Sequence, residues 1–145
     1  MSGENLWGTI PRLKDIETPG KILREQSDYL SQATEGVLEA HVLETWKGTS
    51  DDGVGEDKHN DDLKELHLDL CIRSPFLEGH FINVIRVIHQ LQIFPVTMVN
   101  FLTYPFEYIT INNAEEFKQH LSRVLQSEEL LTELKEMIIK AKLVE

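Results

Sequence analysis

The chain has 145 residues, 25 of them acidic and 14 basic, and a formal net charge of −11. This length suits a single domain over residues 1–145, large enough to bury a core without disulfides or metals. The negative charge disfavours nucleic acid and anionic membranes as partners and favours positively charged proteins. Cys71 is the only cysteine, so no internal disulfide can form, which predicts a cytoplasmic protein. No apolar run is long enough to predict a membrane span.

The N-terminal segment, residues 1–17, shows no regular hydrophobic period. It contains Leu6, Trp7, Ile10 and Pro11, which predict an extended strap. We expect its apolar side chains to pack on the body of the domain, and a peptide-like docking arm is the alternative interpretation.

A helix is predicted from Pro19 to Glu35. Thr18 suits the N-cap, Pro19 the first helical position and Gly36 the position after the last turn. Between them, apolar side chains recur at helical spacing.

Two strands are predicted on either side of an acidic loop at 48–62. Residues 37–46 and 63–73 alternate between apolar and polar positions, as in "LKELHLDLCIR". Two such strands around one loop predict a long antiparallel hairpin.

Three further strands are expected after this hairpin. Residues 80–94 are apolar on both faces, which predicts a strand covered on two sides. Pro95 interrupts this run, so residues 95–101 are interpreted as a short edge strand or a kinked continuation. Residues 106–111 form a weaker strand pattern.

The chain ends in two predicted helices. Asn113 and Glu116 form a capping box, and Ser127 marks a break or a second cap. The order of elements predicts an α+β fold, with an antiparallel sheet of about four or five strands packed by an N-terminal helix and two C-terminal helices.

Metal and catalytic sites find little support in the sequence. The acidic loop does not match the calcium-binding loop of EF-hands when the pattern starts at Asp51 or at Asp57, so it is interpreted as a hairpin tip. His67 and Asp69 share one face of a strand, Cys71 continues the row, and His41 could lie opposite. A metal-binding protein or small hydrolase using this row is therefore the alternative hypothesis. Alternation alone produces such a row on a solvent-facing strand, so we predict no catalytic residue and no cofactor.

Two other features suggest binding. The stretch "FLTYPFEY" holds Phe101, Tyr104, Phe106 and Tyr108, which either cover the end of the core or form a binding surface. Arg86 and His89 lie in the apolar strand at 80–94. They predict a structural ion pair, with a carboxylate from the strap or a C-terminal helix, or a strand end that reaches solvent. The alternative is a polar pocket between sheet and helices.

The stretch "NLWGTIPRLKDIETPGKILREQSDYLSQATEGVLEA" resembles the start of a group of small bacterial proteins in which an LWG-x-IPR strap precedes a proline-capped helix. The C-terminal "EEFKQHLSRVLQSEELLTELKEMI" is similar to that group in style. The resemblance implies a bacterial cytosolic origin and an α+β fold, and it implies no activity, cofactor or site residue.

These observations predict a small protein-interaction module without catalytic activity. Its expected interface residues are Trp7, Tyr104, Phe106 and Tyr108, with the acidic loop attracting a basic protein partner. A homodimer through the apolar stripe of the last helix is an open alternative.

Overall fold

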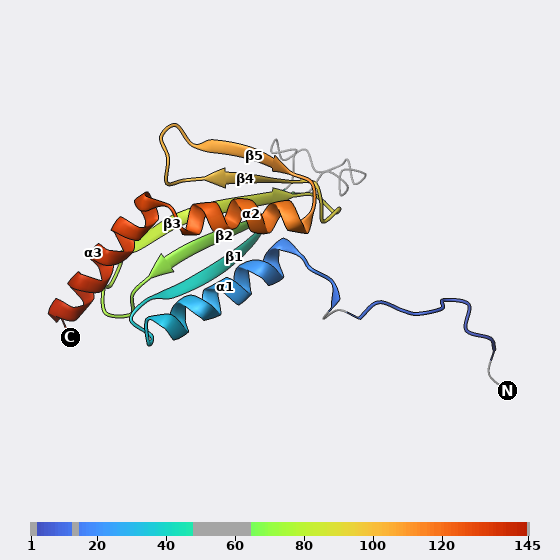
Figure 1. Cartoon of the computed structure of the whole chain (residues 1–145), viewed down its shortest axis with the longest axis horizontal. Helices are drawn as coiled ribbons and strands as arrows, with labels where there is room; N and C mark the ends of the chain where they lie inside the picture. Colours follow the sequence, from blue (N-terminus) through green and yellow to red (C-terminus); the bar gives the residue numbers. More distant parts are fainter. Residues whose placement is uncertain (1–2, 13–14, 48–64, 145) are drawn as a thin grey trace, which may run out of the picture.

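The computed structural model describes residues 3–12, 15–47 and 65–144 of the chain. Within these ranges the elements are α1 (Pro19–Ala33), β1 (Glu39–Lys47), β2 (Glu65–Arg73), β3 (Phe81–His89), β4 (Val96–Asn100), β5 (Glu107–Ile111), α2 (Ala114–Leu125) and α3 (Glu128–Val144). The strands form one antiparallel sheet in the order β1-β2-β3-β4-β5. The three helices lie against one face of this sheet (Figure 1). The predicted α+β fold is confirmed.

Helix α1 begins where its local sequence predicts and ends earlier. The Thr18 hydroxyl oxygen accepts a hydrogen bond from the Lys21 backbone N–H at 3.1 Å, and Pro19 is the first helical residue. The helix ends at Ala33 and not at Glu35. The Thr34 hydroxyl donates to the Leu30 carbonyl at 2.9 Å and accepts from the Leu38 N–H at 3.1 Å. These two bonds tie the last turn of α1 to the approach to β1.

The predicted hairpin is confirmed in its two strands. Val42 of β1 pairs with Leu70 of β2, and both side chains lie on the helix side of the sheet, where Leu68, Leu70 and Ile72 are buried. The acidic loop at 48–62 lies outside the described residues.

Strand β3 differs from its prediction because of a β-bulge. Leu70 pairs with Ile85, but the next residue of β2 pairs with Asn83, so Val84 is an extra residue on β3. Val84 and Ile85 are consequently both buried, with 0% exposure. The expectation that both faces of β3 are covered is therefore wrong. Two adjacent residues that point into the core produce the same unbroken run of apolar residues as a strand buried on both faces. Phe81 at the start of the strand is 59% exposed on the other side.

The interpretation of residues 95–101 is corrected as well. Strand β4 pairs with both β3 and β5, so it lies inside the sheet and is neither an edge strand nor a continuation of β3. Among the described strands, the two at the edges of the sheet are β1 and β5. Proline is tolerated because Pro95 precedes the first strand residue, Val96.

The two C-terminal helices follow the predicted boundaries. Asn113 Oδ1 accepts from the Glu116 N–H at 2.9 Å, and Glu116 Oε1 accepts from the Asn112 N–H at 3.1 Å. Ser127 separates the helices, and its hydroxyl oxygen accepts from the Leu130 N–H at 3.3 Å. Phe117 of α2 is fully buried against the sheet. None of the described helices has the length and apolar character needed to cross a membrane.

The strap contradicts the expectation that it packs on the body. Leu6 is 87% exposed, Trp7 81% and Ile10 60%. Figure 1 shows this segment, in dark blue, running away from the helices and the sheet. The body holds it near its end, where Glu17 forms an ion pair with Lys118 of α2 at 2.7 Å.

Candidate functional site

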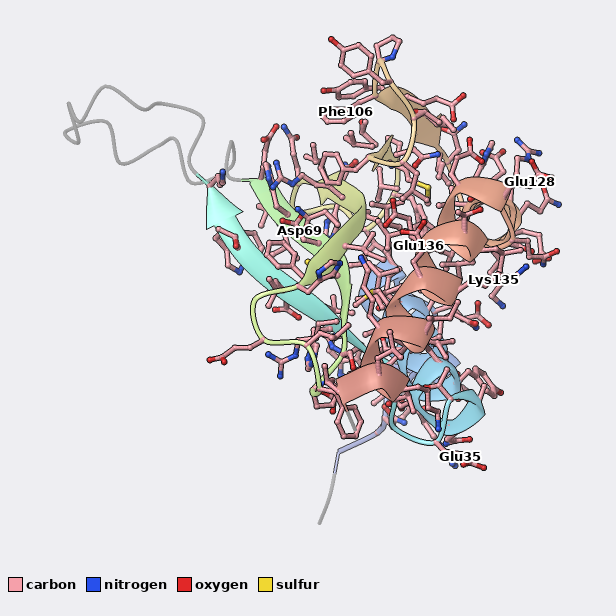
Figure 2. All side chains as sticks on the ribbon, turned by 90° about the vertical axis from the view of Figure 1, so that its left-hand side faces the viewer. Glu35, Asp69, Phe106, Glu128, Lys135 and Glu136 are labelled. Atoms are coloured by element: carbon pink, nitrogen blue, oxygen red, sulfur yellow. The ribbon has the colours of Figure 1, made fainter. Side chains whose placement is uncertain are left out.

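The candidate site lies on the outer face of the sheet, the face opposite the helices. In Figure 2 the sheet and α3 form separate layers, with Asp69 on the sheet and Phe106 on the hairpin of β4 and β5. The alternation of each strand and the register of the pairs place a mixed set of side chains on the outer face. They include His41, Leu43, His67, Asp69, Cys71, Arg73, Phe81, Asn83, Arg86, Ile88, Val99 and Tyr108.

An ion pair stacked on an aromatic ring forms the centre of this face. Arg86 Nε donates to Asp69 Oδ1 at 2.7 Å, and its Nη2 donates to Oδ2 at 3.0 Å. The Arg86 guanidinium carbon lies 5.6 Å from the centre of the Phe101 ring, and that ring meets Phe106 edge to face at 5.0 Å. The hydrogen bond to Asp69 is the main cause that raises the pKa of Arg86, against the opposing effect of burial. The side chain is thus held in one orientation.

The partner of Arg86 corrects two sequence-based expectations. Its carboxylate comes from β2, and not from the strap or a C-terminal helix. His89 follows Arg86 by three residues on β3, with no bulge between them, and its strand partner is Leu66 of β2. Arg86 and His89 therefore point to opposite faces of the sheet and line no common pocket.

Cys71 lies next to this pair and donates its thiol hydrogen to Asn83 Oδ1 at 3.0 Å. Burial raises the pKa of Cys71, and the negative charge of Asp69 raises it further, while Arg86 lowers it. A cysteine nucleophile needs the opposite environment, since the thiolate is the reactive species. This environment favours a protonated, hydrogen-bonded thiol.

Two adjoining hollows open on the outer face. One, of about 330 Å³, is lined by Asp69, Asn83, Arg86, Phe101 and Phe106. The other, of about 750 Å³, is bounded by the connection between β2 and β3 and is lined by residues that include His41, Leu43, Cys71, Arg73 and Phe81. The Cys71–Asn83 hydrogen bond joins the linings of the two hollows. Together they form a shallow depression from β1 to the hairpin of β4 and β5.

The polar groups of the alternative metal or hydrolase site have separate partners. His41 Nε2 accepts from Arg73 Nε at 3.1 Å, His67 Nε2 lies 3.2 Å from Glu65 Oε1, and Asp69 binds Arg86. His41 lies opposite Cys71 in the register, whereas His67 lies opposite Thr45, four residue pairs further along. Among the described residues, no group of three or more His, Cys, Asp or Glu side chains is arranged to hold a metal ion.

The aromatic residues of the predicted interface do not all lie together. Tyr104 is 96% exposed, Tyr108 67% and Phe106 46%, and all three belong to the hairpin of β4 and β5. Trp7 is exposed on the strap, which leaves the body elsewhere (Figure 1). Sequence reasoning did not single out Leu43 and Phe81, which extend the apolar part of the outer face. The signal for Leu43 is an apolar side chain at a polar position of an alternating strand, and Phe81 has no such signal because its strand has apolar residues on both faces of the pattern.

Comparisons with protein-family models, with curated proteins and with solved structures find no match to this chain.

Proposed function

We propose that the chain is a protein-interaction module that binds a basic partner protein on the outer face of its sheet. The observation that supports this best is the group of exposed aromatic side chains around the Asp69–Arg86 pair, on a sheet face that no described helix covers. The binding surface consists of the two hollows and of Tyr104, Phe106 and Tyr108 beside them.

The surface has the properties of a recognition site. Tyrosine and arginine are enriched among the residues that dominate binding energy at interfaces. Arg86 is already oriented by Asp69 and Phe101, so binding a partner does not have to restrict its side chain. Phe81, at 59% exposure, and Leu43, at 54%, add apolar area at the other end of the depression.

Charge supports a basic partner. The ionic groups on the outer face largely neutralise one another, as in the Asp69–Arg86 pair and in the 3.8 Å contact of Arg73 with Glu39. The chain as a whole carries a formal charge of −11. Its long-range field therefore attracts a basic protein, while the aromatic surface provides the specific contacts.

Site-specific photo-crosslinking tests this proposal. A benzophenone amino acid replaces Tyr104 in one variant and Tyr29 in a matched control, since Tyr29 is also exposed, at 64%, but lies on α1 on the opposite side of the sheet. We expect irradiation in cells to link position 104 to one basic protein. We expect the purified pair to form a complex that Tyr108→Ala weakens at least tenfold.

Two results would contradict the proposal. One is equal crosslinking to the same protein from positions 29 and 104. The other is a crosslinked protein whose affinity in the purified pair does not change with Tyr104→Ala or Tyr108→Ala.

A further inference from the structure

The strap exposes apolar side chains in a locally ordered turn. Asn5 Oδ1 accepts from the Trp7 N–H at 3.0 Å, and Asn5 Nδ2 donates to the Gly8 carbonyl at 3.3 Å. Gly8 has a φ of 68°, which favours glycine. The turn carries Leu6 and Trp7, both more than 80% exposed. Such exposed aromatic and aliphatic side chains are unfavourable in water unless a partner covers them.

The helix side of the molecule carries an apolar pocket of about 250 Å³. Its floor is Ala40, Leu70 and Ile72 of the sheet, and its walls include Leu30 of α1 and Leu130 and Leu134 of α3. An apolar lining offers the water in this pocket few hydrogen bonds. An apolar side chain is therefore the favoured occupant.

A groove between α1 and α2 leads to this pocket. It encloses about 560 Å³ and begins at the Glu17–Lys118 ion pair, where the strap joins the body. Gln26, Tyr29 and Leu125 line both the groove and the pocket, so the two are continuous. We call them together the helix-side groove.

We propose that the strap of one copy of this chain binds in the helix-side groove of a second copy, with the Trp7 indole in the apolar pocket. The dimensions agree. From Glu17 to Leu30 the groove follows α1 for roughly 20 Å at ~1.5 Å per residue. The described residues that follow the turn, 8–12, span roughly 17 Å of this distance when extended, at ~3.3 Å each.

The direction of the strap favours a second copy over the chain's own groove. Figure 1 shows the strap leaving the body on the side away from the C-terminal end of α1, where the pocket lies. Reciprocal binding of two straps is a closed, two-fold symmetric arrangement, in which each groove is filled once. It covers two indole rings, each of ~150–250 Å², with the Leu6 and Ile10 side chains and the matching groove surface, which approaches the ~1,200 Å² of small stable interfaces.

Tryptophan fluorescence tests the arrangement directly. The chain has two tryptophans, so Trp46→Phe leaves Trp7 as the only one. We expect the emission of this variant to shift to shorter wavelength as protein concentration rises, together with the monomer-to-dimer transition in sedimentation. Ala33→Leu narrows the rim of the pocket and should abolish both changes. Gln32→Leu is the matched control, because position 32 is the neighbouring exposed residue of α1 outside the pocket lining.

A mixing experiment separates binding in a second copy from closure within one chain. The first component carries Trp46→Phe and lacks residues 1–12, so it has a free groove and no tryptophan. The second carries Trp46→Phe and Ala33→Leu, so it has Trp7 and a narrowed groove. We expect titration of the first into the second to shift the Trp7 emission to shorter wavelength and to form a heterodimer. Sedimentation and circular dichroism of each component alone confirm that both fold.

Three outcomes would overturn the proposal. They are a Trp7 emission typical of exposed indole at every concentration, a short-wavelength emission that does not depend on concentration, and a mixture without a heterodimer. The proposed binding on the outer face does not depend on these results, since the hollows and Tyr108 lie on the other side of the sheet.

Discussion

Arg86 and Asp69 illustrate how one cross-strand pair organises a surface. Both lie at half-buried positions of neighbouring central strands, and two parallel hydrogen bonds of 2.7 and 3.0 Å join them. A guanidinium forms both parallel hydrogen bonds to the carboxylate and lays its planar face on Phe101. An ammonium group is a compact charge that can form neither the paired hydrogen bonds nor the planar stack.

Arg86→Lys should therefore lower the free energy of unfolding by about 1–2 kcal/mol. Urea denaturation followed by circular dichroism measures this change. Arg24→Lys is the control, because Arg24 pairs with Glu44 at a position where both side chains are about half exposed, 53% and 47%. We expect it to cost less than about 0.5 kcal/mol, as is usual for surface pairs. Equal losses in the two variants would show that the outer-face pair has no special role.

The pKa of the Cys71 thiol depends on the charges of Asp69 and Arg86. Burial and the Asp69 carboxylate raise its pKa, so at pH 8 a smaller fraction is thiolate than in an ordinary cysteine. Asp69→Asn removes the negative charge that raises the pKa of Cys71 and leaves the positive charge of Arg86 that lowers it, so the pKa should fall. We expect iodoacetamide to alkylate Cys71 faster in this variant at pH 8, with the midpoint of the pH–rate profile moved to lower pH. Glu65→Gln, on the same strand, is the control. An unchanged midpoint would contradict the assigned effect of Asp69.

Among the elements, those with local signals could be predicted from the sequence. The start of α2 depends on Asn113 and Glu116, which are close in the chain, and both cap bonds are present. The end of α1 depends on the contact of Thr34 with Leu38 and was placed two residues too far along.

Asn113→Ala should lower the free energy of unfolding by about 1 kcal/mol, because the Glu116 N–H loses its acceptor. Thermal unfolding of the variant measures this loss. Asn112→Ala removes a neighbouring exposed amide whose side chain does not cap the helix, and it should change stability by less than about 0.5 kcal/mol. A comparable loss at Asn112 would mean that the capping bond is not the cause.

Strand contacts between distant residues were less accessible from the sequence. Alternation indicated β1 and β2 correctly, because the apolar side chains of both strands pack toward the helices. Ala40 and Val42 of β1 are partly buried there, and Leu68, Leu70 and Ile72 of β2 are buried. The bulge at Val84 breaks the alternation of β3, so its outer face could not be identified from the sequence pattern. The interior position of β4 depends on its pairing with both β3 and β5, which are distant signals. The Asp69–Arg86 pair, 17 residues apart, follows only from the exact register. The aromatic hairpin was found from composition, but its distance from Trp7 was not.

On the scale of the whole molecule, the sheet separates two surfaces with different physical character. The helix side has an apolar pocket, whereas the outer face combines aromatic residues with paired charges. The two proposed interactions therefore respond to salt in opposite directions. Two copies of a chain with a net charge of −11 repel each other, and a basic partner is attracted to it.

Raising the sodium chloride concentration from 50 to 500 mM shortens the Debye length from about 14 to about 4 Å. Dimerisation through the strap should become stronger by roughly three- to tenfold, since screening removes repulsion and leaves the apolar contacts of Trp7 intact. Binding of the basic partner should become weaker by at least the same factor. Sedimentation of the chain alone measures the effect on dimerisation. Titration calorimetry of the variant that lacks residues 1–12 with the basic protein identified by crosslinking measures the effect on partner binding. A dimer that dissociates in salt would show that charge, and not the indole, holds it together.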